Sequence, residues 1–146
     1  MKVYLSGEIH TNWRDEIIDG SKGLNISFST PVTNHSVSDD CGSHILGVEN
    51  DKYWHDKKSA QINSIRIRSG IEQSDIIIVR FGEKFKQWNA AFDAGYAAAL
   101  GKSLIIMHDP SLSHALKEVD AAALAVAEKP NQVVKILKYV ITGELS

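Results

Sequence analysis

The chain has 146 residues, of which 43% are hydrophobic and 23% are charged, the proportions of an ordinary globular protein with a sizeable core. Its formal net charge is −2, and Lys and Arg form no basic stripe, so we expect no nucleic-acid partner. A single cysteine, Cys41, excludes an internal disulfide framework. No apolar run reaches the ~18 residues of a membrane span and no charged leader precedes one, so the sequence favours a cytoplasmic location without membrane contact.

Strand and helix patterns alternate along the chain. Short apolar runs bounded by Gly, Pro or polar residues indicate strands, and apolar residues at helical spacing indicate helices. Gly just past a helix end and Pro in a first turn mark some of the boundaries. In chain order, the predicted elements are a strand at Lys2–Ser6, a helix at Asn12–Lys22, a strand at Asn25–Ser29, a helix at Ser59–Gln73, a strand at Asp75–Arg80, a helix at Gln87–Leu100, a strand at Ser103–His108, a short helix at Ser111–Lys117, a strand at Ala121–Ala127 and a last helix from Pro130.

The sequence also predicts which side chains of one strand and one helix are buried, and it predicts a long loop between two of the elements. The near-continuous apolar run of Asp75–Arg80 implies burial on both faces of its strand. In the helix of Ser59–Gln73, Ile62 and Ile65 lie on the expected inner side. The polar segment Pro31–Asp56 shows neither the alternation of a strand nor the apolar spacing of a helix. We therefore expect a long loop, of the kind that is often functional or mobile.

Five repeats of strand and helix predict a parallel sheet with helices on both faces. The expected fold is an α/β, flavodoxin-like (Rossmann-like) three-layer sandwich with a five-stranded parallel sheet of order 2-1-3-4-5. That order comes from fold statistics and is not displayed by the sequence itself. We expect residues 1–146 to form one domain.

Polar side chains gather after the predicted strand ends. The carboxyl ends of parallel strands meet at one edge of a sheet, where α/β proteins bind their ligands. These side chains therefore predict a single crevice for a small molecule. They follow four strands and include Gly7, Glu8, His10, Asn12, Trp13 and Arg14, then Asp39, Asp40, His44, Trp54, His55 and Asp56, then Phe81, Gly82, Glu83 and Lys84, and then His108 and Asp109.

The segment QWNAAFDAGYAAALGK, residues Gln87–Lys102, is the most informative stretch. Asn89 and Asp93 are four residues apart, so their side chains leave the same face of the predicted helix, close to its start. A carboxylate placed there is a candidate for chemistry. The alternative is structural, because Asp93 also complements the positive end of a helix and Asn89 suits a position near the cap.

The other candidates also have structural alternatives. Ser6-Gly7 is a turn that Gly permits, and Glu8 and His10 suit a solvated loop. Trp side chains are more often anchors of cores and loops than platforms for a flat ring. Arg14 and Arg80 suit ion pairs with carboxylates.

The sequence gives little support for a metal site or a cofactor site. Suitable ligand atoms occur in one region, but their spacing matches no common zinc pattern, and no glycine-rich phosphate-binding motif is present. Nothing in the sequence places a His beside Cys41 to activate it as a nucleophile. We expect no metal and no cofactor; the ligand-bearing residues considered are Asp39, Asp40, His44, His55 and Asp56.

Three motifs give the chain a family resemblance. The opening KVYLSGEIH followed by NWR, the segment SDIIIVRFGEKFKQWN and the segment FDAGYAAALGK together resemble the YtoQ family, which is grouped with the nucleoside 2-deoxyribosyltransferases. The resemblance covers most of the chain. Its link to the characterised transferases is a strand end of the type YLSG and a carboxylate-x-Gly-Tyr-Ala pattern before Gly-Lys.

The resemblance implies an enzyme that acts on the N-glycosidic bond of a nucleoside or nucleotide through a helix carboxylate. The relatives' nucleophile is a Glu, and the matching residue here is Asp93. The relatives also carry an Asp about one and a half turns earlier, where this chain has Gln87-Trp88-Asn89 and no Asp. The implied catalytic residues are Asp93, Asn89 and Glu8. Asn89 would orient Asp93 or hold a sugar hydroxyl, and Glu8 (or Glu83) would supply the acid that the missing Asp provides in the relatives. The implied substrate-binding residues, of which Gly7 would admit the sugar and Phe81 or Trp88 would stack on the base, are Ser6, Gly7, His10, Phe81, Gly82 and Trp88.

Other functions remain open at this level. The chain could be a nucleoside or nucleotide N-glycoside hydrolase, or a non-catalytic nucleotide-binding module that lost the acid. A phosphoribosyl or NAD-type glycohydrolase would need an anion site, for which His10 with Arg14 is the candidate. Gly95 and Ala99, four apart on an Ala-rich face, permit close helix approach, and the resemblance implies a homodimer or higher homo-oligomer.

Overall fold

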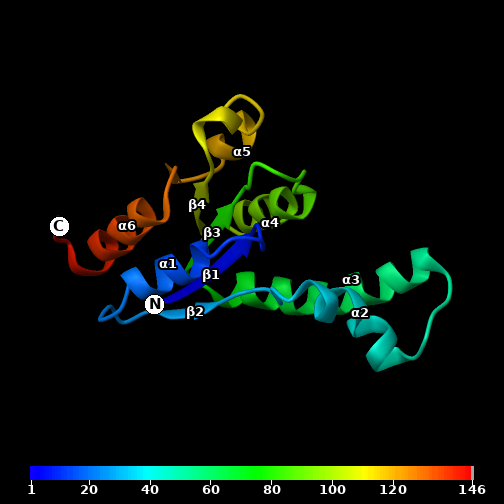
Figure 1. The fold of residues 1–146 in the computed structure, drawn as a ribbon. Coiled ribbons are helices and arrows are strands. Elements are labelled where there is room, and N and C mark those ends of the chain that lie inside the picture. The colour runs from blue at the N-terminus through cyan, green and yellow to red at the C-terminus, as the bar shows by residue number, and fades with distance from the viewer. Residues whose placement is uncertain (146) are drawn as a thin grey trace.

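A computed structural model describes residues 1–145. Its five strands form one parallel sheet of order β2-β1-β3-β4-β5, which confirms the predicted α/β fold and strand order (Figure 1). The elements in chain order are β1 (Lys2–Gly7), α1 (Trp13–Gly20), β2 (Ser27–Ser29), α2 (His35–Leu46), α3 (Lys52–Gln73), β3 (Ile76–Arg80), α4 (Trp88–Ala99), β4 (Ser103–Met107), a 3₁₀ turn η1 (Pro110–Leu112), α5 (Lys117–Ala121), β5 (Ala125–Ala127) and α6 (Pro130–Thr142).

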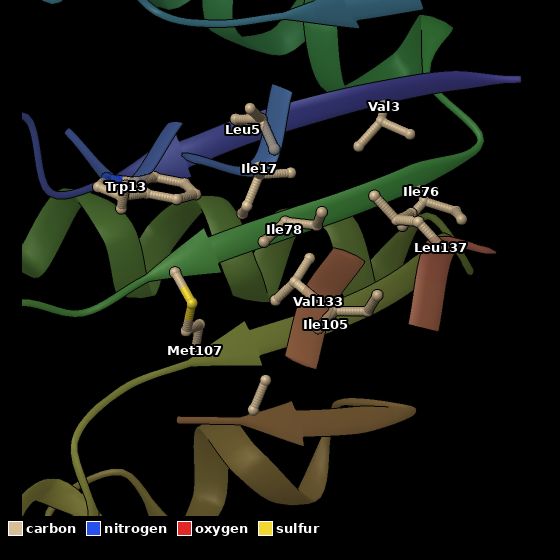
Figure 2. Packing of buried hydrophobic residues seen from close by; sticks show 11 residues of the cluster. Val3, Leu5, Trp13, Ile17, Ile76, Ile78, Ile105, Met107, Val133 and Leu137 are labelled. Atoms are coloured by element: carbon tan, nitrogen blue, oxygen red, sulfur yellow. The ribbon is translucent and has the colours of Figure 1, made fainter. Parts of the chain in front are cut away.

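The three central strands separate two hydrophobic cores. Successive side chains of a strand point to opposite faces, so Val3 and Leu5 of β1 join one core and Tyr4 joins the other. The first core packs the sheet against α1 and α6, with Trp13 and Ile17 fully buried (Figure 2). The second packs it against α3 and α4. Every second residue of β1 therefore faces α4, and Ser6 is one of them.

The prediction of a long loop over Pro31–Asp56 is wrong. Most of it is helical, because α2 occupies its middle and α3 begins at Lys52. Each helix has an N-cap that sequence reasoning passed over: the Asn34 side chain accepts from the Val37 N–H, and the Asp51 side chain accepts from the Tyr53 N–H. The composition of α2 is rich in Ser, Asp and His and includes one Gly. All of these are weak helix formers, so tertiary packing rather than propensity stabilises the helix.

Helix α2 folds back on the first half of α3 to form an arm that reaches beyond the sheet (Figure 1). The contact is close because Gly42 is buried against the backbone of α3, and a Cβ at this position would lie 2.5 Å from the Ser59 nitrogen. Ser59 Oγ accepts from the Gly42 N–H at 3.0 Å and donates to the Asp39 carbonyl. Asn63 donates to the Ser38 carbonyl at 2.9 Å. These bonds fix the first turns of α2 over the sheet edge.

Some smaller expectations also differ. Ile65 was expected on the inner face of its helix, but its side chain is 69% exposed, and Ile71 is fully buried instead. The short helix expected at Ser111–Lys117 is not continuous: η1 overlaps its start and α5 begins at its last residue. The strand expected at Ala121–Ala127 contains only the three residues of β5. Within residues 1–145, no helix has the length and apolar character needed to cross a membrane.

Candidate functional site

Helix α4 presents one stripe of residues to the sheet, and Asp93 lies within it. Ala90, Ala94 and Ala97 are buried on this stripe, and Asp93 is 7% exposed between them. Because β1 directs Ser6 to the same side, Ser6 Oγ donates a hydrogen bond to Asp93 Oδ2. This contact joins the end of β1 to the second turn of α4, and it leaves Asp93 Oδ1 for another partner.

The environment makes Asp93 an unusually basic carboxylate. Burial disfavours its charged form and raises its pKa to about 6, while the hydrogen bond from Ser6 opposes part of that effect. Neighbouring Tyr4 has a raised pKa because of its own burial and then because of the Asp93 charge. Above pH 6, Asp93 is therefore ionised, poorly solvated and well positioned, as a nucleophile or an electrostatic stabiliser must be.

Two cavities meet at Asp93. The first, of about 520 Å³, contains aromatic side chains; we call it the aromatic lobe, lined among others by Ser6, His10, His35, Phe85 and Trp88. The second, of about 400 Å³, is lined by many hydroxyl, amide and charged side chains together with apolar Ala60, Ile67 and Phe92. We call it the polar lobe, lined among others by Asp39, Ser59, Asn63, Ser64 and Arg68. Ser38, Ile67, Asn89 and Asp93 line both lobes.

Glu8 lies at the aromatic lobe, but its carboxylate already has several partners. The N–H groups of His10 and Thr11 and the Thr11 hydroxyl all donate to it, and Arg80 Nε lies 3.6 Å from Oε2. Burial on its own would raise the pKa of Glu8, but these hydrogen bonds and Arg80 outweigh it and hold the pKa below its usual value. Glu8 therefore orders the turn after β1, and it stays ionised at neutral pH.

Two glycines are required by packing within the protein. Gly7 has a φ of 102°, and a Cβ there would lie 2.1 Å from the Arg80 carbonyl oxygen of the neighbouring strand. At Gly82, a Cβ would lie 2.6 Å from Glu8 Cγ, and the Gly82 N–H donates to the Gln87 side chain at 2.8 Å. Both glycines keep the ends of β1 and β3 together.

The aromatic residues near the site divide into core and surface. Phe81 is 6% exposed and belongs to the core between sheet and α4, where it clusters with Ala90, and it is not among the residues that line the lobes. Trp88 is 73% exposed and lines the aromatic lobe. Phe85 lines it too, with its ring centroid 4.8 Å from that of His10. Among these aromatic residues, Trp88 and Phe85 are the ones placed to meet a flat ligand.

Arg14 does not face the cavity. Its side chain is buried, and its guanidinium donates to the carbonyls of Leu5, Glu8 and Gly7 at 3.0, 2.6 and 3.0 Å. Trp13 donates to the same Glu8 carbonyl at 2.7 Å. Arg14 thus holds the carboxyl end of β1, and the anion site considered for His10 with Arg14 is not formed.

Other polar residues of the predicted crevice lie elsewhere. His108 is buried after β4, where it contacts the Asp109 carbonyl and the Asp120 carboxylate, and it lines neither lobe. His55 lies 3.3 Å from Asp40 on the outer part of the arm. Within the described residues 1–145, no group of three or more His, Cys, Asp or Glu side chains is placed to hold a metal ion.

Sequence reasoning missed several residues that line the site. His35 and Ser38 come from α2, which was expected to be loop, and Arg68 and Ile67 come from α3. Local patterns could not have shown His35 and Ser38, because these residues reach the site only when α2 folds back on α3, whereas Ile67 and Arg68 lie on the predicted helix of Ser59–Gln73. The one available signal was the cap sequence that begins at Asn34.

The strand order and the site at the carboxyl edge of the sheet define a flavodoxin-like α/β protein. Residues 4–141 match the family model described as Nucleoside 2-deoxyribosyltransferase YtoQ, and the chain belongs to this family.

Two individual proteins extend this comparison. The chain is 45% identical over 144 residues to a protein of Bacillus subtilis (strain 168) described as uncharacterized protein YtoQ, with 97% of each chain covered. Among solved structures, it resembles a 2-deoxyribosyltransferase from Bacillus psychrosaccharolyticus with a TM-score of 0.56, 15% sequence identity and coverage of 92% of this chain and 90% of that chain. The structural likeness supports the fold.

Proposed function

We propose that this protein acts on the N-glycosidic bond of a nucleoside or nucleotide, with Asp93 as the group that meets the sugar. The observation that carries the proposal is the position of Asp93: buried, hydrogen-bonded by Ser6, with a pKa raised to about 6, and on the wall shared by two cavities. Family membership makes deoxyribosyl transfer the favoured reaction.

The chemistry follows from the geometry of the carboxylate. Cleavage of an N-glycosidic bond passes through an oxocarbenium-like state, which a carboxylate beneath C1′ stabilises or traps as a covalent glycosyl-enzyme. The bond from Ser6 holds Oδ2, so Oδ1 is the oxygen available to C1′. A desolvated carboxylate interacts more strongly with positive charge developing at C1′ than a hydrated one does.

The remaining assignments place the substrate across both lobes. Asn89 lines both lobes one helical turn before Asp93 and is suited to a sugar hydroxyl. Trp88 and Phe85 offer rings for the base in the aromatic lobe, where His10 also lies. Glu8, Gly7 and Gly82 would act indirectly, because they hold the end of β1 that carries Ser6.

The proposal is tested by a chromatographic screen of purified protein against nucleosides and 5′-monophosphates, with and without a second free base. Release of a base alone identifies a hydrolase, and a new nucleoside identifies a transferase. Asp93→Asn should lower turnover by about 1,000-fold or more, because it removes both the nucleophile and its charge. Exposed Asp15 of α1 supplies the matched control, Asp15→Asn, which should keep full activity.

Full activity of Asp93→Asn would disprove the role of Asp93. Thermal stabilisation by a nucleoside without any turnover would favour a non-catalytic binding module, since a ligand that binds only the folded state raises its melting temperature.

We further infer a homodimer, because the outer face of α4 leaves Phe92 57% exposed beside exposed Gly95 and Ala99.

A further inference from the structure

A base leaves a sugar readily only when it receives a proton, so the reaction needs a general acid as well as a nucleophile. Asp93 is committed to C1′ in the proposed function. Glu8 is the other carboxylate at the aromatic lobe, but its hydrogen bonds and Arg80 hold it ionised. Because an ionised carboxylate has no proton to donate, the donor must be another residue of the aromatic lobe.

His35 satisfies this requirement. It is the first residue of α2 and lines the same 520 Å³ lobe as Asp93, which enters that lobe from α4. Its Nδ1 lies 2.7 Å from Oδ2 of Asp39, one helical turn later. A carboxylate at Nδ1 fixes the tautomer and ring orientation of an imidazole, which leaves Nε2 to exchange a proton. A His oriented in this way is a common form of acid–base catalyst.

The surrounding structure fixes the first turn of α2. Asn34 caps the helix by accepting from the Val37 N–H at 3.1 Å. Ser38, beside Asp39, is held by the Asn63 side chain of α3. His35 is therefore presented from the end of the arm that lies at the sheet edge, although its side chain is 66% exposed without a substrate. A bound base would cover it.

We propose that His35, oriented by Asp39, is the general acid–base of the reaction on which the proposed function rests. As Asp93 Oδ1 bonds to C1′, the C1′–N bond breaks and its electron pair goes to the base. The proton on His35 Nε2 moves to the base at the same time. In the second half, water or an acceptor base attacks C1′, the C1′–O bond to Asp93 breaks, and His35 takes the proton that the attacking group loses.

His10 is the competing candidate, because its ring lies 6.5 Å from that of His35 in the same lobe. Its ring contacts Phe85, and Glu8 binds its backbone N–H rather than its imidazole. Within residues 1–145, no carboxylate is paired with the His10 ring in the way that Asp39 is paired with His35. The other charged groups lining this lobe are Lys86, Glu8 and Asp93.

The test compares two substrates in the same variants. The first is the nucleoside found in the screen, and the second has the same sugar and a leaving group that needs no proton: an N7-methylpurine or, for a pyrimidine substrate, a nitrophenyl group. Because a general acid contributes about 10²–10⁴-fold, His35→Gln should lower kcat on the ordinary nucleoside by about 100-fold or more. On the activated substrate the change should stay within about threefold. Asp39→Asn should give the same pattern with a smaller loss.

The controls separate this inference from the proposed function. Exposed His44 lies on the same helix and lines neither lobe, so His44→Gln should behave as the unmodified protein on both substrates. Asp93→Asn should lose activity on both, and its failure to do so would overturn the proposed function instead. An equal loss on both substrates in His35→Gln, or a selective loss in His10→Gln with His35→Gln unaffected, would overturn the role of His35.

Discussion

At Asp93, the same burial that suits a nucleophile opposes folding. The carboxylate has a pKa of about 6 in the folded protein and an ordinary value of 3.8 when exposed. Below pH 3.8 it is protonated in both states, and no penalty exists. As the pH rises toward 6 the folded state binds more protons than the unfolded state, so the free energy of unfolding falls. Above pH 6 the penalty is complete, at about 3 kcal/mol.

We therefore expect Asp93→Asn to be more stable than the unmodified protein at pH 8, by up to about 3 kcal/mol in the free energy of unfolding. The gain should shrink as the pH falls from 6 to 4 and vanish near pH 4, because only the ionised carboxylate is disfavoured by burial. Denaturant unfolding at several pH values measures it, with Asp15→Asn as the exposed control. A gain that is independent of pH would show that ionisation of Asp93 is not its cause.

At the level of single residues, the helical spacing of α4 predicted that Asn89 and Asp93 leave the same face of the helix, and both line the two lobes. Sequence reasoning did not predict the hydrogen bond from Ser6 to Asp93, because local spacing does not say which face of the sheet a helix covers. It could not separate Phe81 from Phe85, because both follow β3 within a few residues, yet one is 6% and the other 58% exposed. That difference depends on how the chain turns after Arg80.

Among the elements, α2 illustrates the limit of local patterns. Its residues have low helix propensity, and its stability comes from the contact of Gly42 with α3 and from the hydrogen bonds of Ser59 and Asn63. These partners lie 17 and 25 residues away along the chain. Sequence analysis therefore placed α4 correctly but missed the helix that brings His35 to the site.

This contact predicts the effect of Gly42→Ala. At an open helical site Ala is favoured over Gly by about 1 kcal/mol, but here the new methyl group would meet backbone atoms of Lys58 and Ser59 at 2.6 and 2.5 Å. Overpacking costs about 1–3 kcal/mol, so we expect a net loss of stability and, because α2 lines both lobes, a higher KM. Thermal unfolding and kinetics measure both.

His44→Ala is the control within α2, because His44 is exposed and should change stability by less than about 0.5 kcal/mol. If Gly42→Ala instead stabilised the protein, α2 would have to pack on α3 less closely than the structure indicates.

For the molecule as a whole, α4 has one face that packs on the sheet and another that points outward. Ala90, Ala94 and Ala97 pack on the sheet, whereas Gly95 and Ala99 face outward. The small residues of the inner stripe therefore serve packing on the protein's own sheet, whereas Gly95 and Ala99 do not. A Cβ at Gly95 would meet no atom within 4 Å, so the fold itself does not require glycine there. Close approach of a second copy would give this glycine a role.

We therefore expect sedimentation equilibrium to show a homodimer, and Gly95→Arg to shift it to monomer. The added side chain meets nothing within the protomer, and Arg is a better helix former than Gly, so the monomer should fold with an unchanged or higher melting temperature. In the dimer it would separate two helices that need small residues to approach closely. A strict monomer for the unmodified protein would exclude this assembly, and a dimer that survives Gly95→Arg would place the interface on another surface.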